Sequence, residues 1–258
     1  MTLIDAHTHL DHYQAEFLPV ALAEIEQQQI LTISVAMDIP SYQQTKEIAA
    51  ASRWIVPTFG IHPWRAYLYA DKLAALDPWI AESPLLGEIG LDYVWDEDPA
   101  HYPLQRTVFE YFLAAAKAQD KVVNLHTKGA EAEILDLLRR YAVKRAIIHW
   151  YSGPLDVLDK LIDAGCYFTI GVELMVSAQI QAIAQRVPLG QLLTETDNPG
   201  GQQWLTGEVG MPHLTQTVAT QLATLKQLAT EDLRAIVQAN FQRLAPEVQS
   251  YLAIHHPG

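Results

Sequence analysis

The chain has 258 residues, of which half are hydrophobic and 18% are charged, and its formal net charge is −13. This composition is typical of a globular protein with a core, and the acidic charge disfavours a non-specific nucleic-acid binder, which usually carries a basic patch. A single cysteine, Cys166, excludes an internal disulfide. Because we find neither a signal-peptide pattern nor an apolar run that could span a bilayer, we predict a cytoplasmic protein without a membrane segment.

Short apolar segments alternate with longer amphipathic ones along the chain. The short segments are rich in Ile, Val, Leu and Thr and close on Gly, Pro, Asp or Asn, which is typical of buried parallel strands. Their ends are expected near residues 9, 36, 62, 88, 126, 149, 171 and 197. The longer segments, such as 15–29, 102–119 and 130–142, repeat apolar residues at helical spacing.

Eight such strand–helix units at nearly even spacing predict an α/β fold, a single (β/α)8 barrel of the TIM type that covers residues 1–258. The even spacing disfavours an open sheet with a second domain. The longest interval, from 88 to 126, holds an acidic loop at 96–102, and residues 211–252 are expected to form two extra C-terminal helices.

The first predicted strand carries three polar side chains at a spacing of two residues. Asp5, His7 and His9 share one face of this strand, because successive side chains of a strand alternate between its two sides. Two imidazoles directed into the mouth of a barrel suit a divalent metal ion. Asp5 is expected to be either a third ligand or a group that orients one of the imidazoles.

Other strands lead to further candidates. The third strand leads to His62, and the fourth leads to Glu88, which stands between glycines at positions 87 and 90. Burial of an unpaired, ionised carboxylate in a strand costs free energy or shifts the group to its neutral form. A bound metal ion would remove that cost. The fifth, sixth and eighth strands end at His126, His149 and Asp197.

We expect six of these residues to converge at the C-terminal mouth of the barrel, where the active sites of this fold lie. The candidate metal ligands are His7, His9, Glu88, His126, His149 and Asp197. Four imidazoles and two carboxylates suffice for two divalent cations about 3.5–4 Å apart, which can polarise a phosphoryl or carbonyl oxygen and activate water. The mixed nitrogen and oxygen ligands suit zinc or manganese, and magnesium is a poorer match.

Six ordered segments of the chain resemble the TatD family of metal-dependent hydrolases, a branch of the amidohydrolase-like barrels. The matching segments are DAHTHLD (5–11), GIHPW (60–64), GEIGLDY (87–93), NLHTKG (124–129), IIHWYSG (147–153) and TETDNPG (194–200). The resemblance implies a TIM-type barrel with two metal ions and phosphodiester hydrolysis, often described as deoxyribonuclease activity.

The resemblance also implies a role for each matching residue. One metal ion would be held by His7, His9 and Asp197, the other by His126 and His149, with Glu88 as the bridge between them, while His62 would contact a substrate phosphate. The chain departs from the family where substrate would sit. It has Lys128 in place of the usual arginine and Trp150-Tyr151-Ser152-Gly153 in place of Cys-Phe-Ser-Gly, and residues 200–214 lack the arginine and asparagine often found there.

Several residues keep two interpretations. Asp92 either supports a metal ligand or caps the loop after the fourth strand, and Lys128 either contacts phosphate or is a solvated cation at a helix start. Four tryptophans after predicted strands either stack on bases or pack over the barrel mouth: Trp64, Trp95, Trp150 and Trp204. Five histidines are interpreted as surface or local structure: His12, His101, His213, His255 and His256.

The sequence therefore predicts a two-metal phosphodiesterase that acts through a metal-activated water on nucleic acid or another phosphodiester, with no obligate protein partner. Asp197 would act as the general base and Glu88 as the bridging catalytic carboxylate, while His62 and Lys128 would hold the phosphate. The alternative enzyme is an amidohydrolase or lactonase that uses the same metal chemistry on a small molecule. A third hypothesis is a metal-binding scaffold without hydrolytic activity.

Overall fold

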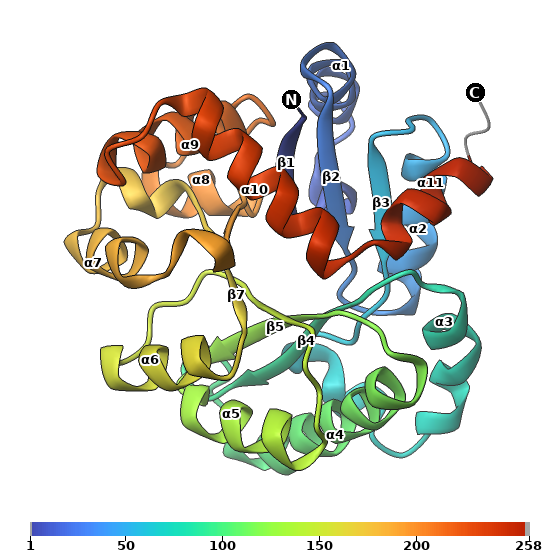
Figure 1. The fold of residues 1–258 in the computed structure, drawn as a ribbon. Helices are drawn as coiled ribbons and strands as arrows, with labels where there is room; N and C mark the ends of the chain where they lie inside the picture. Colours follow the sequence, from blue (N-terminus) through green and yellow to red (C-terminus); the bar gives the residue numbers. More distant parts are fainter. Residues whose placement is uncertain (1, 256–258) are drawn as a thin grey trace.

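Eight short parallel strands alternate with helices in the computed structural model, which describes residues 2–255 (Figure 1). The strands are β1 (Leu3–Thr8), β2 (Ile30–Val35), β3 (Ile55–Thr58), β4 (Leu86–Asp92), β5 (Val123–Lys128), β6 (Ala146–Ile148), β7 (Tyr167–Ile170) and β8 (Leu192–Thr194). Every strand residue except Tyr167 is buried, as expected for strands that are covered on both faces.

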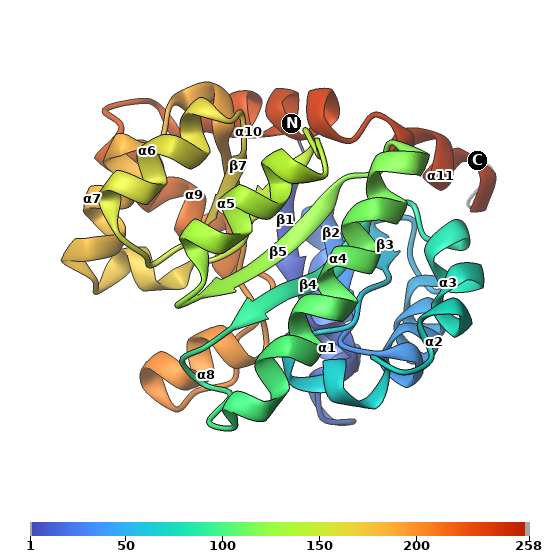
Figure 2. The same cartoon turned by 90° about the horizontal axis from the view of Figure 1, so that it is seen from below.

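The helices lie outside the strands, and the long helix α4 buries the apolar side that its sequence periodicity predicts. They are α1 (Leu18–Gln28), α2 (Ile39–Ala49), α3 (Asp77–Glu82), α4 (Tyr102–Gln119), α5 (Glu131–Arg140), α6 (Leu155–Asp163), α7 (Ala178–Arg186), α8 (Gly200–Thr206), α9 (Leu214–Leu225), α10 (Thr230–Leu244) and α11 (Glu247–His255). Figure 2 shows α4 and α5 running along the outside of β4 and β5.

The strands form two ladders that are joined into the predicted TIM-type barrel. One ladder has the order β1-β2-β3 and the other β4-β5-β6-β7-β8. A parallel bridge between Phe59 and Leu86 joins the two ladders on one side. On the other side the chain after β8 closes against β1, where the Asp197 amide donates to the His7 carbonyl at 3.0 Å and the His9 amide donates to the Asn198 carbonyl at 2.8 Å.

Three predicted strand ends were wrong. Strand β8 ends at Thr194 and not at Asp197, which lies in the loop that follows. Strand β3 ends at Thr58 and not near residue 62, and Pro63 opens a 3-10 helix over Pro63–Leu68. Strand β4 continues beyond Glu88 to Asp92, because it still pairs with β5 there. His62 therefore lies in a loop, and Glu88 lies inside a strand.

The C-terminal segment contains three helices among the described residues, α9, α10 and α11, where two were predicted. The break falls at Ala245, which precedes Pro246, and the residue before a proline is disfavoured in helical conformation. Helices α9 and α10 pack over β1 and β8, so they cover the line where the barrel closes. Within residues 2–255, every helix is too short or too polar to cross a bilayer.

Candidate metal centre

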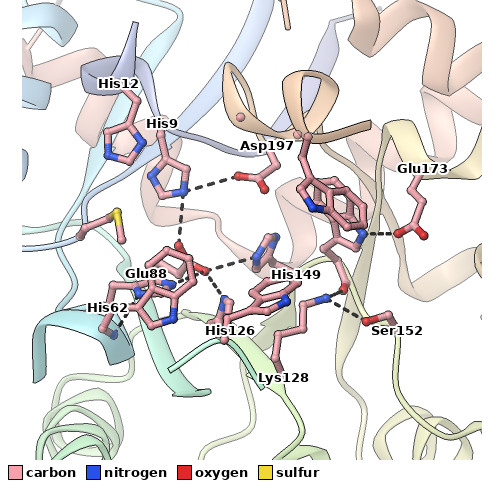
Figure 3. Close-up of a pocket in the computed structure, with 17 residues that line it drawn as sticks. His9, His12, His62, Glu88, His126, Lys128, His149, Ser152, Glu173 and Asp197 are labelled. Atoms are coloured by element: carbon pink, nitrogen blue, oxygen red, sulfur yellow. Dashed lines mark hydrogen bonds and ion pairs between the residues drawn. The ribbon is translucent and has the colours of Figure 1, made fainter. Parts of the chain in front are cut away.

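Glu88 lies at the centre of a polar cluster at the C-terminal mouth of the barrel (Figure 3). Its side chain is almost fully buried. The sequence allows this placement through glycines: a Cβ atom at position 60 would lie 2.3 Å from the Glu88 carbonyl oxygen, and one at position 90 would lie 2.0 Å from the His126 carbonyl oxygen. The close approach of neighbouring strands around Glu88 therefore requires Gly60 and Gly90.

The two carboxylate oxygens of Glu88 divide four imidazoles into two pairs. Glu88 Oε2 lies 3.6 Å from His7 Nε2 and 3.3 Å from His9 Nε2. Glu88 Oε1 lies 2.9 Å from His126 Nδ1 and 3.2 Å from His149 Nε2. This is the same division that the family resemblance implies for a bridging carboxylate between two cations.

His7 and His9 are oriented by acceptors outside the cluster. His7 Nδ1 lies 2.9 Å from Asn124 Oδ1, and the Asn124 amide nitrogen donates to the Ala6 carbonyl, which fixes the amide orientation. His9 Nδ1 lies 3.1 Å from the Val35 carbonyl oxygen. Because both partners only accept hydrogen bonds, each Nδ1 carries a proton, and each Nε2 is directed toward Glu88.

His126 and His149 are oriented in the same way, but by carboxylates. His126 Nε2 lies 2.9 Å from Asp92 Oδ2, and His149 Nδ1 lies 3.1 Å from Glu195 Oε2. Each carboxylate accepts a hydrogen bond from an imidazole N–H, and the other ring nitrogen is directed at Glu88. Such carboxylate–histidine pairs are the usual support for imidazoles that bind metal ions.

The arrangement fits divalent cations. His7 Nε2 is buried and has no hydrogen-bond partner within residues 2–255, although a buried imidazole nitrogen normally has one. Ligand atoms of His7, His9 and Asp197 lie within 4.8 Å of one another, as do those of His7, Glu88 and His149. Atoms bound to one zinc ion at about 2.1 Å in tetrahedral geometry would be about 3.4 Å apart, so little movement is needed.

The charges of the cluster also attract cations. Burial alone would raise the pKa of Glu88, but the imidazoles of His62, His7 and His149 hold it well below its usual range. Burial opposes protonation of His9, yet Glu88 and Asp197 outweigh it and raise the pKa of His9 to about 9. Burial and the neighbouring His149 keep the pKa of His7 well below its usual value, so His7 is a neutral imidazole with a free lone pair.

Asp197 joins the pair formed by His7 and His9. Its Oδ1 lies 3.7 Å from His7 Nε2 and 3.5 Å from His9 Nε2. Burial raises the pKa of Asp197 to about 6, against the opposing effects of neighbouring imidazoles. Asp5 does not take either of its predicted roles among the described residues: its carboxylate accepts the Thr196 amide at 2.9 Å and the Thr196 hydroxyl at 2.6 Å, and so fixes the residue before Asp197.

His62 differs from the other imidazoles around Glu88. Its Nδ1 accepts the Trp64 backbone amide at 3.2 Å, so this nitrogen carries the lone pair. Burial lowers the pKa of His62 to about 4, so the ring is neutral and its proton is on Nε2. Nε2 lies 3.5 Å from Glu88 Oε1 and faces the cavity as a donor, which suits a substrate contact better than a metal ligand.

Asp92 combines the two roles that the sequence left open. Its Oδ2 accepts from His126 and from the Trp64 indole at 2.8 Å. Its Oδ1 accepts the amides of Val94 and Trp95 at 2.9 and 2.8 Å. Although burial opposes ionisation, these donors hold the pKa of Asp92 well below its usual range, so it remains an acceptor for His126.

Lys128 is not a solvated cation, so that interpretation was wrong. Its side chain is buried, and Nζ donates to the Trp150 carbonyl at 2.6 Å and to Ser152 Oγ at 2.9 Å. Lys128 ends β5, and this strand carries the side chain into the barrel mouth (Figure 3). Burial lowers the pKa of Lys128, although acidic neighbours such as Glu195 and Glu173 oppose this effect.

A cavity of about 490 Å³ opens over the cluster. Its lining includes Glu88, four of the imidazoles, Lys128, Asp197 and all four tryptophans that follow predicted strands. His12 is exposed, as predicted for a surface residue, but it also lines the cavity and stacks on His9 with ring centroids 4.8 Å apart.

The other described histidines outside the cluster are surface residues or make local contacts, as expected. His101 contacts Asp96, His213 contacts Glu24, and His255 contacts the Tyr251 carbonyl. His256 lies outside the described residues. Cys166 is buried just before β7, and burial raises the pKa of its thiol to about 12, so it is not a nucleophile.

Sequence reasoning missed three supporting residues, Asn124, Glu195 and Glu173. Asn124 precedes His126 by two positions within β5, so the alternation of strand faces could have revealed it, whereas Glu195 lies beyond the end of β8, where that alternation does not apply. Glu173 lies in a 3-10 helix after β7 and accepts the Trp150 indole N–H at 2.6 Å. No local pattern around Glu173 indicates that contact.

A closed parallel barrel whose C-terminal mouth gathers imidazoles around a buried carboxylate defines the class of barrel metal-dependent hydrolases. Comparison with known protein families gives the particular family. The family described as TatD related DNase matches residues 4–246. The chain belongs to this family and is a metal-dependent hydrolase.

Individual relatives match over almost their full lengths. The uncharacterized metal-dependent hydrolase YcfH of Escherichia coli strain K12 is 30% identical over an alignment of 263 positions. The alignment covers 95% of this chain and 96% of that protein. The uncharacterized metal-dependent hydrolase YabD of Bacillus subtilis is 26% identical, with 94% and 98% covered. The crystal structure of YJJV, a TatD homolog from Escherichia coli K12, superposes with a TM-score of 0.83 at 22% identity, with 95% and 98% covered.

Proposed function

We propose that this hydrolase cleaves phosphodiester bonds, and that nucleic acid ends are its substrates. The observation that carries the proposal is the division of the imidazoles by Glu88, with His7 and His9 at Oε2 and His126 and His149 at Oε1. A carboxylate placed in this way suits two adjacent divalent cations, which is the arrangement that phosphodiester-cleaving enzymes use. The description of the family as TatD related DNase supports the same substrate class.

The proposed ligands are His7, His9 and Asp197 for one cation and His126 and His149 for the other, with Glu88 shared. Four imidazoles favour zinc or manganese over magnesium. When bound, such cations would supply Lewis-acid polarisation of a phosphoryl oxygen and would acidify water.

The residues of the chain supply the remaining steps. Asp197 would accept the proton of the attacking water, because its carboxylate lines the cavity beside His7 and His9, where that water would be held. His62 Nε2–H would donate to a phosphate oxygen. Lys128, with two of its three N–H groups used by Trp150 and Ser152, would direct the third toward the phosphate.

One observation favours a competing substrate class. Among the described residues that line the cavity, Lys128 is the one lysine or arginine, so the cavity offers few cations to a phosphate backbone. A neutral lactone or amide would need none. The same cluster could activate water against such a bond, and a direct assay must separate the two possibilities.

The test combines elemental analysis of the purified protein with a substrate panel. Protein loaded with manganese, zinc or magnesium would be assayed on a dinucleoside monophosphate, on single-stranded DNA, and on lactones and amides. We expect about two equivalents of bound metal and release of mononucleotides. Lactone or amide turnover without phosphodiester cleavage would contradict the proposal, and so would bound metal without hydrolysis of any ester.

A further inference from the structure

Four of the six tryptophans of the chain line the cavity over the metal centre. We call this group, Trp64, Trp95, Trp150 and Trp204, the aromatic rim. The rings form two pairs: Trp64 and Trp95 have centroids 6.3 Å apart, and Trp150 and Trp204 have centroids 6.1 Å apart. Such a concentration of indoles at one opening calls for a cause other than the random exposure of apolar groups.

Both pairs lie next to imidazoles of the metal centre. The Trp95 and Trp64 centroids are 6.0 and 6.3 Å from that of His126, and the Trp150 centroid is 6.5 Å from that of His149. A phosphate above Glu88 would therefore have an indole within reach of the groups attached to it.

Lys128 lies between the two pairs. Its Nζ is 5.4 Å from the centroid of the Trp95 ring and 6.0 Å from that of the Trp150 ring, within the range of cation–π contacts. The ammonium group therefore has an indole on either side.

The exposure of the rim disfavours a purely structural role. Trp204 is 66% exposed and Trp95 is 50% exposed, so much of each ring is available for a ligand. Trp150 is half-buried and has a φ of 37°, a backbone conformation that is costly for a bulky residue. Its indole N–H donates to Glu173 at 2.6 Å, which holds the ring at the cavity. Packing alone would bury these rings and would not require an uncommon backbone.

The charge of the cavity indicates how a ligand is held. Among the described residues, the lining contains Glu88, Glu173 and Asp197 but a single lysine, Lys128, and no arginine, and the whole chain carries a net charge of −13. Long nucleic acids gain affinity through many contacts between phosphates and cations, and this cavity offers few. Stacking of bases on aromatic rings needs no such contacts and is available to any base.

We propose that the aromatic rim stacks an unpaired base next to the scissile phosphate. This inference rests on the proposed phosphodiesterase function and adds the feature that selects the substrate. The base would supply most of the affinity, and the phosphate would be positioned by His62 and Lys128. A dinucleotide would therefore bind almost as well as a long strand.

The first experiment compares a dinucleoside monophosphate with an analogue in which both bases are replaced by hydrogen. We expect the wild type to lose roughly 10- to 100-fold in kcat/KM on the analogue, the scale of base–aromatic stacking. Trp204→Ala and Trp95→Ala should each raise KM for the dinucleotide about tenfold and leave the analogue unchanged. Trp54→Ala, a change outside the cavity, should alter neither value.

The second experiment measures binding without turnover. Metal-free protein is titrated with thymidine monophosphate and with deoxyribose phosphate, and the quenching of indole fluorescence is followed. We expect quenching by the nucleotide alone and a Kd about tenfold weaker in Trp204→Ala. Circular dichroism and thermal unfolding of each variant would establish that it is folded.

The outcomes separate this inference from the proposed function. Equal cleavage of the dinucleotide and its base-free analogue by the wild type would overturn the stacking inference and leave the phosphodiesterase intact. Loss of kcat/KM on both substrates in Trp204→Ala would also overturn it. Absence of cleavage of either substrate by metal-loaded protein would contradict the proposed function, while the fluorescence titration would still decide whether the rim binds a base.

Discussion

His9, His126 and His149 line the same cavity as the indoles of the aromatic rim, but the imidazoles and the indoles are held in different ways. His7, His9, His126 and His149 are buried, and each has one ring nitrogen fixed by an acceptor outside the cluster. Trp95 and Trp204 are half or more exposed. The difference fits two different roles. Metal ligands must be fixed in protonation and direction, whereas base stacking tolerates small shifts of a ring.

The largest expected effect is that of Glu88→Ala, which removes the group shared by both pairs of imidazoles. We expect metal content to fall and hydrolysis to decrease by roughly 10³-fold or more, the scale of removing a key electrostatic group from a preorganised site. Circular dichroism should be nearly unchanged. Elemental analysis and steady-state assays would measure both effects, with Glu47→Ala on the exposed side of α2 as the control. Wild-type metal stoichiometry in Glu88→Ala would falsify the bridging assignment.

Asp92→Asn should have the next largest effect, because it acts on His126 without removing a ligand. An amide can donate a proton where the carboxylate only accepts, so His126 would no longer be held with its proton on Nε2. We expect metal affinity or activity to fall about 10- to 100-fold. Asp98→Asn, at a carboxylate that accepts the Ala100 amide in an exposed turn, is the matched control. Unchanged metal affinity and activity in Asp92→Asn would show that Asp92 serves the loop alone.

His62→Asn tests whether His62 belongs with the metal ligands or with the groups that contact substrate. The asparagine oxygen can still accept the Trp64 amide, as His62 Nδ1 does, but the donor at Nε2 is lost. We expect kcat/KM for a phosphodiester to fall about 10- to 100-fold, the scale of one hydrogen bond to a charged group. Metal content should stay at the wild-type level. A loss of bound metal would instead place His62 among the ligands.

Lys128→Gln should have the smallest effect of the four. Glutamine can keep a donor near the Trp150 carbonyl but removes the positive charge. We expect KM to rise about tenfold or less, and the slope of log KM against log salt concentration to fall by about 0.7, the value for one contact to a single strand. Lys121→Gln is the control, because Lys121 also donates to backbone carbonyls, at Ala81 and Ser83. An unchanged salt slope would leave Lys128 with a structural role at Trp150.

The sequence by itself determined the barrel and the residues that meet at its mouth. Alternation in Asp5-Ala6-His7-Thr8-His9 places both imidazoles on one face, and the even spacing of apolar segments predicts where the other strands bring their polar ends. These features follow from local periodicity and from the rule that parallel barrels gather their strand ends at one mouth. The break between α10 and α11 falls next to Pro246, and β3 ends at Thr58, and sequence periodicity alone placed both wrongly.

Only the tertiary structure decided what each side chain does at the mouth. The protonated nitrogen of His7 depends on Asn124, far away in the chain, and that of His149 depends on Glu195. The difference between His62 and its neighbours depends on one backbone amide, and the buried position of Lys128 depends on the loop that holds Trp150. Hydrogen-bond direction and ring exposure are set by distances between segments that are remote in sequence, so no spacing within one segment could reveal them.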